Sequence, residues 1–191
     1  MKTFALAALL ATAGTAYADD AIDPNAAQSA GEANLETKAP REGVTFAAAL
    51  GGGMIISQGK TATAPVLSLR LGHVANASTV VTVELIGGTY AHQPDMTHGT
   101  QVDGEGDLLV GGQVYIAPSV WLRGAGGLGV HTTDDGTGRK TGAGLGGLGG
   151  AGLDLVRWHY AVLGVEAFYC GTFAKGGYVS LGGLSVGLSY Y

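Results

Sequence analysis

Two ionisable side chains, Arg70 and Glu84, stand inside apolar segments of the sequence. Arg70 belongs to Leu67–Leu71, where leucine occupies every second position, and Glu84 belongs to Val81–Leu85, which alternates in the same way. In an extended strand this alternation sends aliphatic side chains to one face and charged side chains to the other. Folding the two segments about residue 77 places Arg70 opposite Glu84. Because a charge in a confined interior is unfavourable unless it is paired, we expect an ion pair between them.

Four further ionisable residues occupy comparable positions in the sequence. They are Arg123, Glu166, Asp107 and Asp154. We expect these side chains to be drawn into polar networks in the interior that the strands enclose. Such a network either fixes the strand register and plugs the interior, which we predict here, or forms a gate or an ion path.

Residues suited to metal binding are gathered in the segment His92–Gly106. The potential ligands are His92, Asp95, His98, Asp103 and Glu105. These residue types suit a divalent cation. However, the two histidines are neither two nor four residues apart, so we predict a solvated loop and no metal site.

The sequence gives even less support for catalytic or cofactor-binding motifs than for a metal site. The motif Gly124-x-Gly126-x-x-Gly129 falls within an alternating segment, whereas dinucleotide binding requires it between a strand and a helix. No serine has a histidine at a spacing typical of a catalytic site, and Cys170 lies in a predicted strand. We therefore predict no catalytic residues, no cofactor and no enzymatic activity.

The elements that must position these residues are eight alternating segments. They are Val44–Ser57, Ala64–Val74, Thr79–Ala91, Asp107–Ala117, Ser119–His131, Gly142–Val156, Trp158–Phe173 and Gly177–Tyr191. Each reaches the roughly 9–11 residues that a tilted strand needs to cross a bilayer. We predict an all-β fold: an eight-stranded antiparallel up-and-down transmembrane β-barrel.

The connections between these segments alternate in length. The longer, mostly polar connections are Gln58–Thr63, His92–Gly106, Thr132–Thr141 and Ala174–Gly176, and the short ones centre on Asn76-Ala77, Pro118 and Arg157. Bacterial outer-membrane barrels have short periplasmic turns and longer external loops. The alternation therefore predicts that the first strand starts in the periplasm.

Composition supports strands that face lipid. Glycine accounts for 35 of the 191 residues and charged residues for 13%. The glycines follow no three-residue period, which excludes collagen, and the chain after the N-terminal segment has no apolar run long enough for a spanning helix. The single cysteine cannot form a disulfide within the chain. A closed, hydrogen-bonded barrel would hold an exported chain together instead.

The N-terminal residues predict export. Lys2 is followed by the apolar run Phe4–Leu10 and by Ala16-Tyr17-Ala18, which is the pattern of a cleavable signal peptide. We predict a signal peptide at residues 1–18, a disordered periplasmic leader at 19–42 and the barrel at 43–191. Without residues 1–18 the chain has 9 basic and 15 acidic residues, a balance that argues against a nucleic-acid partner.

Aromatic residues near the strand ends predict two membrane-interface girdles. The residues assigned to them are Phe46, Trp121, Trp158, Tyr160, Tyr169, Tyr178, Tyr190 and Tyr191. In the last segment the aliphatic row Leu184–Leu188 is in phase with Tyr190. Tyr190 is therefore the better candidate for a lipid-facing anchor, and Tyr191 should turn inward or stay at the rim.

The region Gly43–Tyr191 resembles the outer-membrane β-barrel family, comprising the OmpA-like transmembrane domain and its eight-stranded relatives. The signal peptide, the eight segments, the closing sequence GYVSLGGLSVGLSYY and the Arg70/Glu84 pair carry the resemblance. It implies a monomer in the Gram-negative outer membrane, in contact with lipid and lipopolysaccharide and inserted by the barrel-assembly machinery. We predict a structural or surface-interaction role with a plugged lumen. The alternatives are a narrow pore for small solutes, a lipid A-modifying enzyme and a secreted, lipocalin-like barrel.

Overall fold

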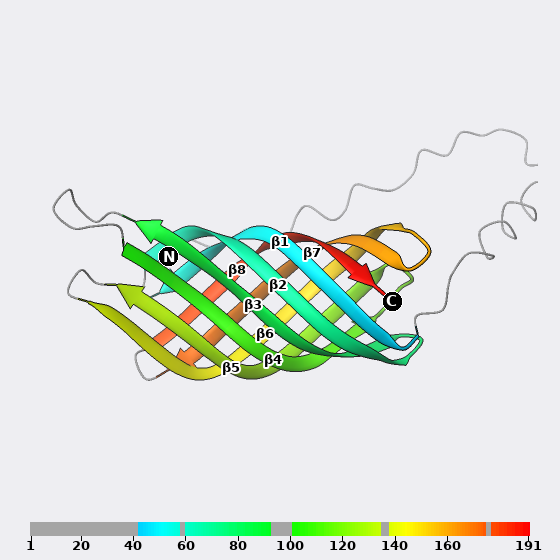
Figure 1. The fold of residues 1–191 in the computed structure, drawn as a ribbon, viewed down its shortest axis with the longest axis horizontal. Coiled ribbons are helices and arrows are strands. Elements are labelled where there is room, and N and C mark those ends of the chain that lie inside the picture. The colour runs from blue at the N-terminus through cyan, green and yellow to red at the C-terminus, as the bar shows by residue number, and fades with distance from the viewer. Residues whose placement is uncertain (1–41, 58–59, 93–100, 135–137, 175–176) are drawn as a thin grey trace, which may run out of the picture. The chain divides into compact units, whose positions relative to one another are not determined.

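The chain folds into a closed barrel of eight antiparallel strands, seen in a computed structural model that describes residues 42–57, 60–92, 101–134, 138–174 and 177–191 (Figure 1). Each strand pairs with its neighbours in the sequence, and β1 pairs with β8 to close the sheet. The strands are β1 Val44–Ser57, β2 Lys60–Asn76, β3 Thr79–His92, β4 Gln101–Tyr115, β5 Val120–Asp134, β6 Arg139–Arg157, β7 Ala161–Ala174 and β8 Gly177–Tyr190. The predicted fold class is confirmed.

The predicted N-terminal segments contribute nothing to this description. The signal peptide, and all of the predicted leader except Glu42, lie outside the described residues. Among the residues that are described, no helix is long and apolar enough to cross a bilayer.

Several strands extend further than predicted at one end of the barrel. β2 starts at Lys60, β4 at Gln101 and β6 at Arg139, where the sequence suggested polar loops. Backbone pairing continues there, because main-chain hydrogen bonds form whatever the polarity of the side chains. The strands at this end, called the loop end below, connect through residues 58–59, 93–100, 135–138 and 175–176. The predicted alternation in connection length is correspondingly weaker.

The opposite end, called the turn end below, has its connections at residues 77–78, 116–119 and 158–160. The first of these turns is closed locally, because the Asn76 side-chain oxygen accepts hydrogen bonds from the Ser78 backbone N–H and hydroxyl, each at 3.0 Å. Asparagine commonly closes turns in this way. The turn places β2 and β3 in a register that sets Arg70 opposite Glu84, as the sequence predicted.

The two faces of the sheet differ in polarity. On β2, Leu67, Leu69 and Leu71 are exposed on the outside, whereas Ser68 and Arg70 are buried inside. The same alternation of two recurs on the other strands, as expected for a pleated sheet. The barrel therefore carries an apolar outer surface around an interior that contains its polar residues.

The barrel interior is layered along its length. On β4, the order from the turn end to the loop end is Tyr115, Gln113, Leu109, Asp107 and Glu105, all of them buried. Polar side chains thus lie on both sides of an apolar layer. That layer consists of Ile55, Ala64, Val66, Ile86, Leu109, Leu148, Phe168, Cys170, Val179 and Leu181.

Candidate functional site

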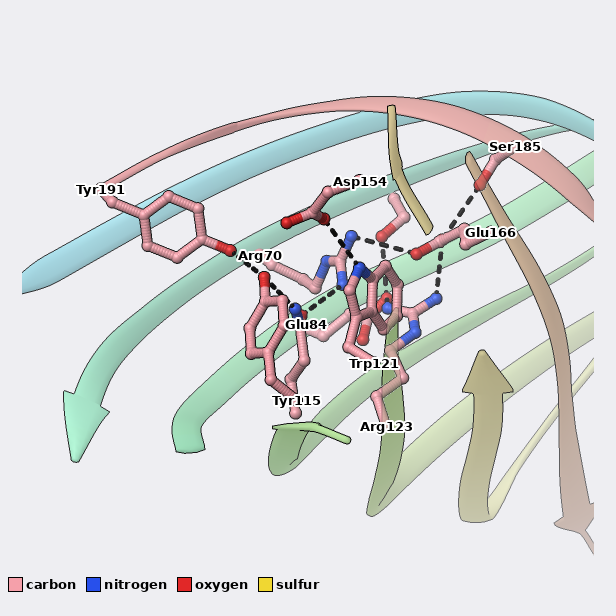
Figure 2. Close-up of polar contacts among 11 residues, drawn as sticks. Arg70, Glu84, Tyr115, Trp121, Arg123, Asp154, Glu166, Ser185 and Tyr191 are labelled. Atoms are coloured by element: carbon pink, nitrogen blue, oxygen red, sulfur yellow. Dashed lines mark hydrogen bonds and ion pairs between the residues drawn. The ribbon is translucent and has the colours of Figure 1, made fainter. Parts of the chain in front are cut away.

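Four buried charged residues meet inside the turn-end half of the barrel (Figure 2). Arg70 is on β2, Glu84 on β3, Arg123 on β5 and Glu166 on β7. Each lies at an inward position because its neighbours in the strand face outward. We call these four residues the charge network; its two guanidinium groups and two carboxylates balance in charge.

Ion pairs link the four residues across the lumen. Arg123 pairs with Glu84 through one guanidinium nitrogen and with Glu166 through the other, the second at 2.9 Å. Arg70 pairs with Glu166 at 3.1 Å. The side chains involved are at most 8% exposed. Because each charge is paired within a poorly solvated interior, removing any one would leave a partner uncompensated.

The predicted direct pair between Arg70 and Glu84 is not among the ion pairs of the described residues. Although the two face each other in register, Arg70 bonds to Glu166 and Glu84 bonds to Arg123. Arginine side chains are long enough to reach across a narrow barrel, so partners on non-adjacent strands compete with the register neighbour. Strand pairing alone does not fix these contacts.

Neutral side chains complete much of the hydrogen bonding. The Ser68 hydroxyl donates to Glu84 at 2.8 Å and the Ser185 hydroxyl donates to Glu166 at 3.0 Å. Arg70 donates to the Gln113 side-chain oxygen at 3.2 Å. The Nε atoms of both arginines have no hydrogen-bond partner in the part of the chain that is described. The network is thus balanced in charge without being saturated in hydrogen bonds.

Hydrogen bonds continue from the network toward the turn end. The Gln113 amide donates to the Tyr115 hydroxyl at 2.9 Å, and Tyr115 shares a hydrogen bond of 2.6 Å with the Tyr191 hydroxyl. Figure 2 shows Tyr191 reaching inward from the end of the last strand to meet Tyr115. The C-terminal residue therefore belongs to the interior at this end.

Trp121 also lies inside the barrel, where it contacts Arg70. The Arg70 guanidinium carbon is 5.4 Å from the centre of the Trp121 ring, within the range of a cation–π interaction. The indole N–H donates to Asp154 at 3.1 Å, and Asp154 pairs with Arg157 at 2.9 Å. Trp121 thus links Asp154 to Arg70 of the charge network.

Little free space remains beside the charge network. A cavity lined in part by Arg70 and Gln113 holds about 10 Å³, and another beside Trp121 and Glu166 holds about 10 Å³. A space of this size accommodates roughly one water molecule. Each of these two cavities beside the charge network is therefore no larger than a water molecule.

A second polar cluster borders the apolar layer on the side of the loop end, and Cys170 belongs to both. Glu105 and Asp107 on β4 and Cys170 on β7 place one carboxylate oxygen each and the sulfur within 4.8 Å of one another. We call these three residues the acid–thiol cluster. Asp107 belongs to this cluster and not to the charge network, because Leu109 lies between Asp107 and Gln113 on the inner face of β4. Asp107 instead accepts a hydrogen bond from Thr172 at 2.7 Å.

Of the potential loop ligands, the structure describes the side chains of Asp103 and Glu105, and it places them in different surroundings. Asp103 accepts a hydrogen bond from the Tyr90 hydroxyl at 2.8 Å, and Glu105 faces the interior rather than solvent. The His92 side chain, Asp95 and His98 lie outside the described residues. The interpretation of Glu105 as part of a solvated loop is therefore wrong, because β4 begins before it.

Six of the predicted interface aromatics are exposed on the outside of the barrel. They are Phe46, Trp158, Tyr160, Tyr169, Tyr178 and Tyr190. The assignment is wrong for Trp121, which is 5% exposed. Trp121 was assigned from its nearness to a strand end, although it is in phase with inward Arg123. Tyr191 bonds to Tyr115, in keeping with the inward turn expected from the phase of the last strand.

Sequence reasoning missed Ser68, Gln113, Ser185 and Cys170 as members of the two clusters. The first three alternate with aliphatic outward residues, so their inward orientation follows from the same period of two. Cys170 is in phase with Glu166 on the same strand. The sequence alternation indicates that these side chains face inward, but it does not indicate which residues they contact across the lumen.

Comparison with known proteins bears on the fold. No protein-family model and no curated protein matches the sequence. The structure is similar to Ail, the attachment invasion locus protein of Yersinia pestis, crystallised with the heparin analogue sucrose octasulfate, at 15% identity and a TM-score of 0.58, covering 78% of this chain and 98% of that one. It is also similar to neisserial surface protein A, at 16% identity and a TM-score of 0.58, with 78% of this chain and 97% of that one covered. The outer membrane protein OprG from Pseudomonas aeruginosa matches at 13% identity and a TM-score of 0.50, with 78% and 95% covered. The chain therefore has the fold of the small eight-stranded outer-membrane β-barrel proteins.

Proposed function

We propose that this chain is an integral outer-membrane protein with a structural or surface-interaction role, whose lumen is closed by the charge network. The observation that carries the proposal is the set of ion pairs that joins β2, β3, β5 and β7 across the interior. Strands on opposite sides of the barrel are held together by side chains that also occupy the lumen. The signal-peptide pattern at residues 1–18 supports export to the cell envelope.

The apolar outer surface supports placement in lipid. Outward leucines and valines on consecutive strands remain exposed, among them Leu67, Leu85, Val110 and Leu128. A soluble protein rarely exposes so continuous an apolar surface. Tyr160 and Tyr190 contact each other at the turn end, with ring centres 6.0 Å apart, where aromatic residues would meet lipid headgroups. Outer-membrane lipid and lipopolysaccharide are the partners proposed for this surface, and the barrel-assembly machinery is proposed to insert a monomer.

Cell fractionation combined with gel migration tests the membrane placement. We expect the chain in the outer-membrane fraction, and we expect a band in unheated SDS that shifts only on boiling, because a closed barrel resists detergent. A chain recovered in the soluble periplasmic or secreted fraction would favour a lipocalin-like barrel instead.

Single-channel recording in planar bilayers tests the closed lumen. The wild-type barrel should show no steady openings. The variant Arg123→Ser/Glu84→Ser keeps the net charge but removes two side chains that fill the lumen, and it should conduct. Steady openings of the wild type would instead favour a narrow pore for small solutes.

The surface-interaction role rests on the fold and on the similarity to an attachment protein. The absence of enzymatic activity stays a prediction. Lipid A from cells that express the chain should have unchanged acylation, and altered acylation would favour a lipid-modifying enzyme.

A further inference from the structure

We propose that Glu105, Asp107 and Cys170 bind a thiophilic divalent cation, with Zn²⁺ the best match, in the loop-end half of the lumen. The donor atoms of these residues lie within 4.8 Å of one another, and all three side chains are buried. Ligands bound to zinc at about 2.0–2.3 Å in tetrahedral geometry stand about 3.3–3.8 Å apart. A small inward movement of the three side chains would therefore close them around one ion.

Unsatisfied buried atoms point to a missing positive charge. Both carboxylate oxygens of Glu105 and one oxygen of Asp107 are buried without a hydrogen-bond partner in the described structure, and Glu105 is only 4% exposed. Neither acid forms an ion pair with any residue that the structure describes. Burying a carboxylate without a partner is strongly unfavourable. A divalent cation would satisfy these oxygens, and its charge would offset the two acids.

The neighbouring strands leave room for the acids and supply another donor. A Cβ atom on Gly129 would lie 2.2 Å from an Asp107 oxygen, so the backbone of β5 makes space for that carboxylate. On the same strand, His131 is the register partner of Glu105 and is buried, with its Nδ1 atom unpartnered. The His131 ring lies against Gly142 and its nitrogens are outside the group of atoms within 4.8 Å, so the ring would have to turn to offer a nitrogen as a fourth ligand.

The donor set selects the class of cation. A thiolate and a histidine nitrogen suit zinc or a similar ion, whereas Ca²⁺ and Mg²⁺ prefer oxygen ligands. The Cys170 thiol donates to the Leu181 carbonyl oxygen at 3.5 Å, and it would release its proton to solvent when it becomes a ligand. The bound ion would tie β4 to β7, two strands that are not hydrogen-bonded to each other.

Metal loading of the whole barrel tests the proposal. Chelated, tag-free protein is unfolded in urea, refolded into detergent with Zn²⁺, Co²⁺ or Mg²⁺, and desalted. We expect one Zn²⁺ or Co²⁺ per chain, a thiolate-to-cobalt charge-transfer band in the Co²⁺ form, and no retained Mg²⁺. Zn²⁺ should also raise the urea midpoint of unfolding, because it binds the folded state.

Variants separate this site from surface binding. Cys170→Ser, Cys170→Ala and Glu105→Gln should lower zinc affinity at least about tenfold, since even losing a residue that orients a ligand costs about 10- to 100-fold. Asp103→Asn is the matched control, because Asp103 lies on the same strand but bonds to Tyr90, and it should bind zinc as the wild type does. Folding of each variant is checked by its heat-shifted gel band. Absence of retained metal in the folded wild type would overturn the proposal, as would equal retention by the folded Cys170 variants.

Discussion

The charge network and the acid–thiol cluster lie in the same lumen, but they differ in how their buried charged groups are compensated. In the network, two arginines face two glutamates, and three ion pairs connect them. In the cluster, two acids and a thiol lie together with carboxylate oxygens that have no partner among the described residues. Both clusters are buried, so burial does not explain the difference. The difference is charge balance: the network is complete in itself, whereas the cluster needs protons or a cation.

The layering explains why the two clusters stay separate. Leu109 on β4 and Phe168 on β7 belong to the apolar layer that divides them. An arginine reaching from the network to Asp107 would have to displace this layer. The two proposals, a lumen closed in the turn-end half and a cation site in the loop-end half, therefore concern separate parts of the interior.

The largest loss of folded stability is expected from removing Arg123, the arginine that makes two ion pairs in the network. Arg123→Met removes the ion-pair partner of Glu84 and one of the two partners of Glu166, and should lower the free energy of unfolding by about 3–5 kcal/mol because it leaves the buried Glu84 charge unpaired. Urea unfolding in lipid vesicles, followed by tryptophan fluorescence, measures the change. Arg157→Met is the matched control: its pair with Asp154 is partly exposed, at 25% for the arginine side chain, so the loss should stay below about 1 kcal/mol. Similar losses in the two variants would remove the special role of the network.

A smaller loss in the free energy of unfolding is expected when Trp121 is displaced without changing any charge. A Cβ atom on Gly152 would lie 2.1 Å from the Trp121 ring, so Gly152→Ala should push the ring away from Arg70 and cost about 1–3 kcal/mol by overpacking. Gly149→Ala is the control, because nothing lies within 4 Å of a Cβ atom there. The same unfolding measurement applies. If Gly152→Ala were as stable as Gly149→Ala, the packing of Trp121 on the network would be unimportant.

The smallest effect on folded stability is expected outside both clusters, at the end of the last strand. Tyr190 is exposed on the outer surface, whereas Tyr191 turns inward to Tyr115. Tyr190→Ala should therefore reduce the yield of assembled, heat-shifting barrel in the outer membrane more than Tyr191→Ala does. The reverse order would show that the inward hydrogen bond matters more for assembly than the outer aromatic ring.

The sequence predicted the fold and the orientation of most side chains because both follow from a period of two. The turn at Asn76 even fixed the register of Arg70 with Glu84 correctly. Contacts across the lumen were beyond such reasoning. They depend on how far a side chain reaches into a closed barrel. Arg70 therefore pairs with Glu166 across the lumen and not with Glu84, its neighbour in the strand register.

The acid–thiol cluster shows the same limit more clearly. Asp107 and Cys170 stand 63 residues apart in the sequence and on strands that do not pair, so no local pattern relates them. Glu105 was assigned to a loop because its surroundings are polar. By contrast, the error at Trp121 was avoidable, since the phase of β5 already placed this residue on the inner face.

The unfolding free energies of Glu84→Gln and Glu105→Gln, measured together in the presence of a chelator, test the central contrast most directly. Each change removes one buried carboxylate from the lumen. Glu84→Gln should lower stability by about 2–3 kcal/mol, because it takes a charged partner from Arg123. Glu105→Gln should leave stability unchanged or raise it by about 1 kcal/mol, because it removes a charge that has no partner. Equal losses in the two variants would contradict the claim that one cluster is balanced and the other is not.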